Sequence, residues 1–384
     1  MRVCSASFYL SVILISALYT LNFFSVPRSG VSSIARSIIL HNKPIIVAHR
    51  GGRGLRPENT LAAMKYTYEH YKPGFMESDI HITRDGEFIF IHDDTLDRTT
   101  NATGYVRDYT LKELRTFDFG YHFTDGKSYP YRGTGVQCST LREGYEYLKD
   151  KNIPLSVEIK DRDIRVVDHL VDYLKTLPGY DRFMCFCIAD NEMSDYFKEK
   201  TNYQLCYEGS EKDVAMYLIT GLAGLRNLYY SIYPNYNRFH HEPFLSVGGI
   251  SMAERSLNVE NEKLNLENFY FTINKREDAA KCIIDDCDGM TSDRPDIIEE
   301  LLVAIKNRKS VTGKRFDGVV SLDAKNVSWD CESWLCLFVD TVCANVTIPV
   351  FLWIVTFIVL VIILSVVNVI IWMIKLPFAK PKTL

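Results

Sequence analysis

Two histidines, an arginine and a pair of carboxylates lie close together in the sequence between residues 46 and 100. His49-Arg50-Gly51-Gly52 follows one apolar run, and His92-Asp93 follows another. Between them, Glu77 and Asp79 are two residues apart in a third apolar run. Because side chains alternate along a strand, both carboxylates point to the same face. Carboxylates this close repel each other, so we expect a cation between them.

A solvated acidic face on an edge strand is the alternative interpretation of Glu77 and Asp79 taken alone. The histidine motifs on either side favour a functional site, because each one ends its own apolar run. Imidazole groups titrate near neutral pH and can act there as acid or base. The span therefore contains groups for proton transfer next to a candidate cation site.

Strand-like and helix-like runs alternate in the part of the chain that must position these side chains. The expected strands cover residues 45–49, 75–83, 153–160, 182–189, 203–207, 244–247, 270–274 and 289–292. Residues 95–138 are expected to form a small insertion after the second strand, and residues 226–243 a long loop at the mouth. This alternation over about 260 residues predicts an α/β fold, the (β/α)8 TIM barrel. A doubly wound open sheet is the alternative, but no Gly-x-Gly-x-x-Gly follows the first strand.

The motifs, in this order, resemble those of the glycerophosphodiester phosphodiesterase family. The resemblance rests first on the His49-Arg50-Gly51 strand end, Pro57-Glu58-Asn59-Thr60 at a helix start, Glu77-x-Asp79 and His92-Asp93. Later motifs extend it: Glu158-x-Lys160, Phe271-Thr272-Ile273-Asn274 and Thr291-Ser292-Asp293-Arg294-Pro295. It covers residues 43–306 and is weakest between residues 185 and 266.

The resemblance implies one divalent cation, held by Glu77, Asp79 and Glu158. At the ends of neighbouring strands these residues would form an oxygen-only ligand set, which suits Mg²⁺ or Ca²⁺. The alternative for Glu158 is an ion pair with Lys160, its neighbour on the same strand face.

The resemblance also implies that His49 and His92 are the catalytic acid and base. Cleavage of a phosphodiester needs one group to activate the nucleophile and another to protonate the leaving alkoxide. Arg50 and Lys160 would bind the substrate phosphate. Phe271 stands where the family has tryptophan, and it is a candidate for packing against the substrate. The remaining histidines considered are expected to be structural: His81, His240 and His241.

Both ends of the chain are uncharged over long stretches. Residues 348–374 predict a transmembrane helix, followed by a short basic cytosolic tail at 375–384. Residues 1–27 predict a second transmembrane anchor or a cleaved signal segment. The barrel domain, 43–306, and a cysteine-bearing stalk, 307–347, would then lie in a lumen or outside the cell. The expected location is thus integral to a membrane.

The composition limits the classes of partner. With 384 residues and 47% apolar content the chain can bury a full-sized core. A formal charge of −4 with no long basic run argues against nucleic-acid binding. Asn101, Asn326 and Asn345 begin glycosylation triplets. Among ten cysteines, we expect Cys185 and Cys187 to be buried thiols and disulfide bonding within residues 331–343.

The predicted function is metal-dependent hydrolysis of glycerophosphodiesters to glycerol phosphate and an alcohol. A lysophospholipase D using the same site on lysophospholipids is the first alternative, because the apolar ends and Phe271 favour a lipid substrate. A sphingomyelinase D-type phospholipase also uses two histidines and acidic ligands, but the Pro57-Glu58-Asn59-Thr60 and Glu158-x-Lys160 motifs favour the first family. A catalytically silent membrane binding module is the alternative from a different class, but no ligand or histidine has been lost.

Overall fold

The computed structural model describes residues 2–26, 44–232, 238–241, 246–247, 250–251, 266–285 and 287–312. The chain divides into two compact units. The larger unit comprises Ser29–Val214 and Asn235–Val327. It contains all the candidate catalytic, ligand and phosphate-binding residues.

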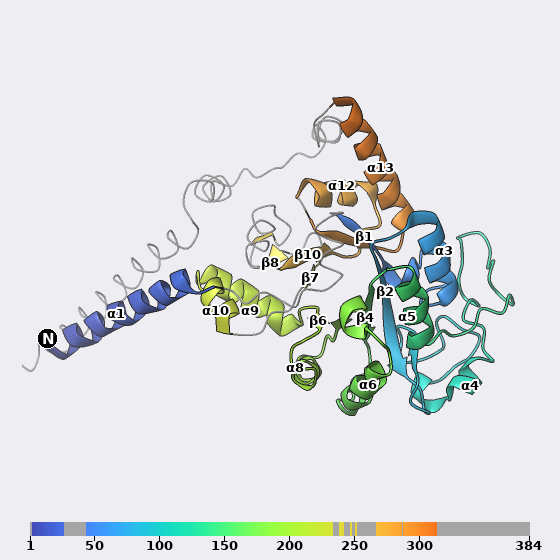
Figure 1. Cartoon of the computed structure of the whole chain (residues 1–384), viewed down its shortest axis with the longest axis horizontal. Helices are drawn as coiled ribbons and strands as arrows, with labels where there is room; N and C mark the ends of the chain where they lie inside the picture. Colours follow the sequence, from blue (N-terminus) through green and yellow to red (C-terminus); the bar gives the residue numbers. More distant parts are fainter. Residues whose placement is uncertain are drawn as a thin grey trace, which may run out of the picture. The chain divides into compact units, whose positions relative to one another are not determined.

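The larger unit is built on a mainly parallel sheet (Figure 1). Its strands follow the order β6-β5-β4-β2-β1-β11-β10-β7, and neighbours on this path are parallel. The strands are β1 Ile45–Ala48, β2 Phe75–Ile82, β4 Leu155–Ile159, β5 Met184–Cys187, β6 Cys206–Tyr207, β7 Arg238–His241, β10 Glu267–Tyr270 and β11 Gly289–Ser292.

This strand order is that of a TIM-barrel-like parallel α/β fold. Strands that follow each other along the chain lie side by side, and β1 lies beside the last strand, β11. Within the described residues no ladder joins β6 to β7. The predicted barrel-like architecture is confirmed, whereas closure of the complete eight-stranded ring stays a prediction.

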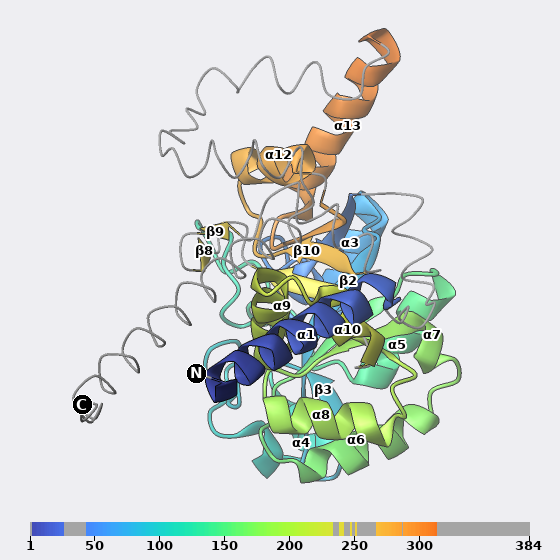
Figure 2. The same cartoon turned by 90° about the vertical axis from the view of Figure 1, so that its left-hand side faces the viewer.

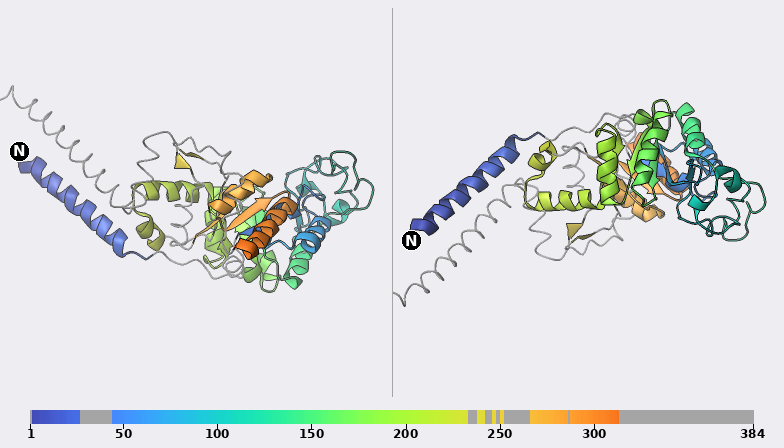
Figure 3. Two further views of the ribbon diagram at one scale, coloured as in Figure 1. Left: turned by 90° about the horizontal axis from the view of Figure 1, so that it is seen from above. Right: turned by 90° about the horizontal axis from the view of Figure 1, so that it is seen from below.

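Helices lie around the sheet (Figures 1 and 3). They are α3 Leu61–Tyr71, α5 Leu141–Asp150, α6 Arg165–Lys175, α7 Tyr180–Phe183, α8 Asn191–Lys200, α12 Arg276–Ile284 and α13 Pro295–Thr312. Figure 2 shows α6 and α8 side by side. The Thr60 side chain caps α3 by accepting a hydrogen bond from Ala63 N, as its place at the predicted helix start suggests. The cap of α5 is Thr140, which forms a capping box with Glu143.

Ser139, directly before the cap residue Thr140, has a different role. Its Oγ accepts a hydrogen bond of 2.9 Å from Leu61 N, in the first turn of α3. Ser139 thereby ties the two helices together, and only the packing of α3 beside α5 makes this contact available. The sequence alone could not distinguish two adjacent hydroxyl residues as caps.

Two buried clusters lie on opposite sides of the sheet. One contains side chains on the strand face that also carries Glu77: Ile45, Val47, Phe75, Cys185, Cys206 and Phe269. The other packs α12 and α13 against β1, β10 and β11, with Ile46, Tyr270, Ile283, Met290, Ile298 and Leu301 among its members. Side-chain alternation along each strand supplies both faces.

Cys185 and Cys206 form a disulfide bond within the first cluster. The two residues are opposite each other in the β5–β6 ladder. The expectation of a buried Cys185 thiol is therefore wrong, because strand pairing brings a distant cysteine beside it. Cys187 is a free thiol, as expected, but it is only partly buried.

The insertion after the second strand has its own small core. β3 Phe88–Phe90 pairs antiparallel with β2, and η2 Val106–Asp108 and α4 Leu111–Leu114 follow it. The core cluster contains Ile89, Ile91, Leu96, Val106, Leu114, Phe119 and Cys138. This cluster gives the residues just after His92 a defined conformation.

Two strands differ from the sequence prediction. The sixth strand of the parallel sheet is β7, in the segment expected to be a loop, whereas β8 Ser246–Val247 pairs antiparallel with β9 Ile250–Ser251 away from that sheet. The seventh strand, β10, ends at Tyr270, where the prediction had it begin. Backbone pairing with a neighbouring strand defines both elements. Residues 226–243 are rich in polar residues, so their composition did not predict the strand β7.

The smaller unit comprises Met1–Arg28, Ala215–Pro234 and Ser328–Leu384. Its described helices are α1 Arg2–Phe24, α10 Arg226–Ile232 and most of α9 Glu211–Leu222. Tyr19 Oη donates to Ala223 O at 2.7 Å, and Asn22 Nδ2 donates to Gly224 O at 3.0 Å. These bonds join the end of α1 to the turn between α9 and α10.

The predicted location is contradicted by the described residues. A helix needs about 20 consecutive apolar residues to cross a bilayer, and no helix in the described part of the chain is long and apolar enough. The integral membrane location, with a lumenal or extracellular catalytic domain and a cytosolic tail, is therefore wrong by this finding. Within the N-terminal segment 1–27, predicted as an anchor or a signal segment, Arg2–Phe24 form α1. Residues 313–384, with the predicted span 348–374, the tail 375–384, most of the stalk, Asn326 and Asn345, lie outside the described residues.

Candidate active site

The carboxyl end of β1 turns sharply into a short 3-10 segment, η1 His49–Gly51. Arg50 has a left-handed φ of 50°, and Gly51 and Gly52 have φ values of 78° and 93°. A Cβ on Gly52 would meet Thr67 Oγ1 at 2.6 Å, and one on Gly51 would meet Ala63 at 3.1 Å. The glycines thus let the His49-Arg50 turn approach α3 closely.

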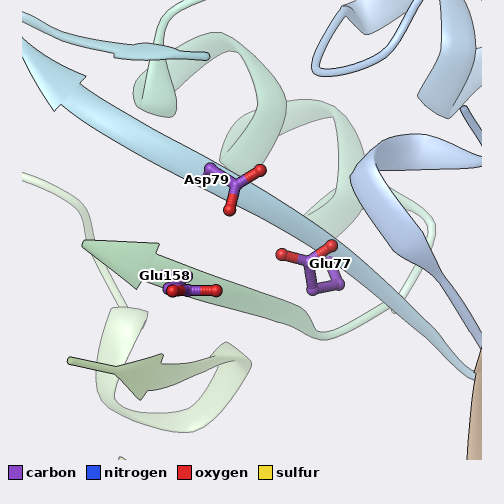
Figure 4. A group of neighbouring side chains, drawn as sticks. All are labelled: Glu77, Asp79 and Glu158. Carbon is purple, nitrogen blue, oxygen red and sulfur yellow. The ribbon is translucent and has the colours of Figure 1, made fainter. Parts of the chain in front are cut away.

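Three carboxylates gather on the neighbouring strands β2 and β4. Glu77 and Asp79 lie on β2, and Glu158 lies opposite Asp79 in the β2–β4 ladder. One oxygen from each carboxylate lies within 4.8 Å of the others (Figure 4). Asp79 is only 1% exposed. The predicted gathering of these three side chains is therefore observed.

The protonation chemistry of this cluster fits a divalent cation. Burial raises the pKa of Glu77 well above its ordinary value, and the nearby Asp79 charge raises it further. A bound cation would relieve both effects, because it neutralises the carboxylates that burial and mutual repulsion disfavour. The donors are all oxygen, the set that Mg²⁺ and Ca²⁺ take.

Two cationic side chains flank the carboxylates. The Arg50 backbone N–H donates to Glu77 Oε2 at 2.7 Å, and its Nε lies 3.3 Å from Asp79 Oδ2. Lys160 Nζ donates to Glu158 Oε1 at 2.5 Å and lies 3.3 Å from Asp79 Oδ1. The Glu158–Lys160 ion pair considered as an alternative is present, and it coexists with the acidic cluster.

The loop before α3 orients both the arginine and the carboxylate pair. Asn59 Nδ2 donates to Asp79 Oδ2 at 2.9 Å, and Asp79 N donates to Asn59 Oδ1 at 3.2 Å. Glu58 Oε1 accepts a hydrogen bond of 3.0 Å from Arg50 Nη1. The Pro57-Glu58-Asn59-Thr60 motif thus holds the side chains of Arg50 and Asp79 in place.

His49 is held by a carboxylate from the other end of the domain. Its Nδ1 lies 2.6 Å from Asp293 Oδ1, and its Nε2 lies 3.9 Å from Glu77 Oε2. Arg53 Nε and Asn274 Nδ2 also donate to the Asp293 carboxylate, at 2.8 and 2.9 Å. Burial tends to raise the pKa of Asp293, but the His49 hydrogen bond and the His49 and Arg53 charges lower it to about 2.

The sequence analysis did not predict Asp293 or Asn274 as site residues, although both belong to motifs on which the family resemblance rests. The available signal was topological. In a barrel the last strand lies beside the first, so the residue after the last strand reaches His49.

A carboxylate also holds the His92 ring. Its Nδ1 lies 2.7 Å from Asp93 Oδ1, and its side chain is 31% exposed. His81 is buried, with Nδ1 3.2 Å from Asp161 and Nε2 3.3 Å from His92 O. This packing agrees with the structural role expected of His81. His240 and His241 lie on β7.

Comparison with known proteins identifies the family. The model described as "Glycerophosphoryl diester phosphodiesterase family" matches residues 49–297. The chain belongs to this family. It is accordingly a phosphoric diester hydrolase, and the family prediction is confirmed.

Among similar proteins, the glycerophosphodiester phosphodiesterase of Caldanaerobacter subterraneus subsp. tengcongensis is 28% identical over 268 residues, which cover 68% of this chain and 98% of that protein. Glycerophosphodiester phosphodiesterase 1 of Homo sapiens is 33% identical over 114 residues, covering 30% and 33% of the two chains. The crystal structure of a glycerophosphodiester phosphodiesterase from Agrobacterium tumefaciens matches with 25% identity and a TM-score of 0.51, over 66% of this chain and 98% of that one.

The glycerophosphoryl diester phosphodiesterase domain contains further polar groups that the sequence did not single out. Glu208, directly after β6, is buried and accepts a hydrogen bond from Ser156 Oγ. Burial raises the pKa of Cys187 well above its ordinary value, and the charges of Glu208 and Glu158 add to this effect. Cys187 is thus a neutral thiol beside the acidic cluster.

Phe271 directly follows β10 in this domain and is 36% exposed. The exposure leaves part of its ring available for contact, so its predicted packing against substrate stays a prediction. Asn101 is exposed in the insertion, and its Oδ1 accepts a hydrogen bond of 2.8 Å from Asp118 N. Glycosylation of Asn101 stays a prediction.

Proposed function

We propose that this chain hydrolyses glycerophosphodiesters to glycerol phosphate and an alcohol, with one divalent cation held by Glu77, Asp79 and Glu158. The observation that carries the proposal is the acidic cluster with His49 within 3.9 Å of Glu77. Family membership supports the substrate class, and the similar phosphodiesterase from Oleispira antarctica was solved with its product sn-glycerol-3-phosphate, at 22% identity and a TM-score of 0.54 over 69% of this chain and 99% of that one. The catalytic domain is proposed to span residues 43–306.

His49 and His92 supply the two proton transfers. In each, a carboxylate accepts a hydrogen bond from Nδ1, which leaves Nε2 as the nitrogen for exchange with the substrate. One imidazole takes the proton of the attacking glycerol hydroxyl of the substrate, and the other gives a proton to the leaving alkoxide; water then opens the resulting cyclic phosphate to glycerol phosphate. Asp293 and Asp93 also stabilise the imidazolium form of their histidine partners.

Arg50 and Lys160 bind the phosphate in this proposal. The buried Arg50 Nε has no hydrogen-bond partner within the described residues, so it is a donor that a phosphate oxygen can satisfy. Lys160 contributes a positive charge. Burial alone would lower its pKa, but the charges of Asp79 and Glu158 outweigh burial, so the pKa of Lys160 is raised. A bound Mg²⁺ or Ca²⁺ would polarise the phosphoryl oxygens and neutralise the charge that develops on them.

The test is turnover by the purified full chain with a panel of substrates. Glycerophosphocholine, glycerophosphoethanolamine and glycerophosphoinositol are compared with lysophosphatidylcholine, each with Mg²⁺, with Ca²⁺ and after EDTA. We expect glycerol phosphate to be released from the first three only with metal present. Activity that survives exhaustive chelation would contradict the metal assignment.

The same panel decides between the alternatives. Faster release of lysophosphatidic acid from the lysolipid would make the chain a lysophospholipase D, which the same residues could catalyse. A Glu77→Gln variant is the background control, because it removes a proposed ligand. Equal signals from this variant and the wild type would indicate a silent binding module.

A further inference from the structure

Arg98 lies in the insertion after β3, and its guanidinium joins two acidic residues from different segments. Its Nε donates to Asp93 Oδ2 at 2.6 Å, and its Nη2 lies 3.2 Å from Asp93 Oδ1. Its Nη1 donates to Glu58 Oε2 at 2.9 Å, and Nη2 donates to Glu58 Oε1 at 2.7 Å. All three guanidinium nitrogens are therefore committed to carboxylates.

Each of these carboxylates also holds a residue with a proposed role in the reaction. Asp93 Oδ1 is the partner of His92 Nδ1 at 2.7 Å, and Glu58 Oε1 accepts from Arg50 Nη1 at 3.0 Å. Arg98 is thus the middle of a continuous hydrogen-bonded network, His92–Asp93–Arg98–Glu58–Arg50. The network spans from the proposed proton carrier to the proposed phosphate-binding residue.

The ionisation of Asp93 and Glu58 stabilises this network. Burial acts to raise the pKa of Asp93, but the hydrogen bonds from Arg98 and His92 lower it to about 2. Burial acts in the same way on Glu58, but the hydrogen bonds and charges of Arg98 and Arg50 together outweigh it, so the pKa of Glu58 is lowered. Both carboxylates are ionised around neutral pH, the state that binds a guanidinium fork.

We propose that Arg98 is a positioning residue that fixes His92 relative to Arg50, and this proposal rests on the proposed function. The His92 side chain is 31% exposed and that of His49 is 16% exposed, so packing alone restrains the His92 ring less. A planar guanidinium holds two carboxylates at a set distance and angle, which an ammonium cannot do. Because its nitrogens are committed, Arg98 acts through its partners rather than on the substrate.

The test compares Arg98→Ala and Arg98→Lys with a matched control, Arg84→Ala. Arg84 is also exposed and donates to a carboxylate, Glu113, at 2.8 Å. A misplaced acid–base group costs on the order of 10- to 100-fold in rate, so we expect kcat to fall by that amount in Arg98→Ala. KM should stay within about threefold, since Arg98 makes no proposed contact with substrate. Arg98→Lys should recover only part of the loss, and Arg84→Ala should resemble the wild type.

Chemical rescue adds a readout that a purely structural role would not change. The Arg98 side chain is 45% exposed, so added guanidinium can reach the space it leaves. Guanidinium at low millimolar concentration should restore part of kcat in Arg98→Ala, while methylammonium should not. An unchanged kcat in Arg98→Ala, or a rise in KM alone, would overturn the positioning role.

An activity-independent measurement separates this proposal from the proposed function. Ring ¹⁵N chemical shifts of His92 should report a single Nδ1-protonated tautomer in the wild type and a mixture in Arg98→Ala, with Arg98→Lys as the second variant if the first does not fold. Unchanged shifts would overturn the positioning role. Absence of turnover by the wild type, with the shifts changed as expected, would instead overturn only the proposed function.

Discussion

At the scale of single residues, the two histidines provide the most direct prediction. His49→Ala and His92→Ala should each lower kcat by roughly 100-fold or more, the usual effect of removing a general acid or base. The measurement is steady-state turnover of glycerophosphocholine with saturating metal. His70→Ala is the matched control, because His70 is exposed and its Nδ1 lies 2.8 Å from Tyr66 O in its own helix. Near-normal kcat in either variant would remove that histidine from the mechanism.

Metal binding should depend on pH through Glu77. Because burial and the Asp79 charge raise the pKa of Glu77, a cation must displace a proton at acid pH. Affinity for Ca²⁺ should therefore fall as the pH drops, and binding should release protons. Calorimetric titration at several pH values, in buffers of different ionisation enthalpy, measures both. Glu77→Gln should bind weakly without proton release, whereas exposed Glu69→Gln should match the wild type.

Asp293 should stabilise the fold in a defined pH window. The pKa of Asp293 in the folded chain is about 2, below the ordinary 3.8. A lowered pKa means that the ionised carboxylate contributes stability above pH 4, which is lost as the pH falls toward 2. The difference in free energy of unfolding between the wild type and Asp293→Asn should thus shrink from pH 5 to pH 3, measured by urea denaturation. A difference independent of pH would contradict this assignment.

At the scale of elements, α5 shows packing overriding helix propensity. Alanine is preferred to glycine inside a helix by about 1 kcal/mol, so propensity alone predicts that Gly144→Ala stabilises the chain. A Cβ at Gly144 would instead collide with the Phe90 ring of β3. We expect a loss of about 1–3 kcal/mol in the free energy of unfolding, the usual cost of overpacking. Exposed Glu146→Ala in the same helix should change stability little.

The β5–β6 pair shows what a ladder adds to a sequence pattern. Cys185 and Cys206 are far apart in the chain, and only their opposite places in neighbouring strands allow a disulfide bond. Cys185→Ser with Cys206→Ser should lower the free energy of unfolding by about 3 kcal/mol, since the bond closes a loop of moderate length. Denaturation of the variant and of the reduced wild type should then agree. Equal stability of oxidised protein and variant would contradict a structural bond.

At the scale of the whole molecule, metal binding should stabilise the folded chain. A ligand that binds only the folded state adds about 2.7 kcal/mol at a concentration one hundred times Kd. The thermal midpoint should therefore rise with added Mg²⁺ or Ca²⁺ and fall after EDTA. Glu158→Gln should lose the rise, because it removes one oxygen ligand from the cluster. If NaCl at equal ionic strength raised the thermal midpoint by the same amount, the effect would be screening of surface charges and not metal binding.

The predicted membrane location is contradicted by the described helices, whereas the predicted span 348–374 lies outside the described residues. The uncharged N-terminal run forms α1, yet its Tyr19 and Asn22 are engaged in hydrogen bonds to the turn after α9. No helix of the described residues satisfies the length and apolarity needed for crossing.

The sequence by itself determined the features that depend on local periodicity and motif order. Alternation along one strand placed Glu77 and Asp79 on one face, and the alternation of strands and helices predicted the barrel-like fold. The family was predicted from the order of its motifs, which can be read from the sequence alone. These signals lie within a few residues of each other, which is why they could be read directly.

Only the tertiary structure decided which distant residues meet. It brought Asp293 to His49 across 244 positions, joined Cys185 to Cys206 and set Arg98 between Glu58 and Asp93. It also chose β7 as the sixth strand. Such contacts depend on strand order, register and the path of the insertion, and none of these leaves a local pattern in the chain. The sequence therefore named the chemical groups, while the fold determined how each is oriented and charged.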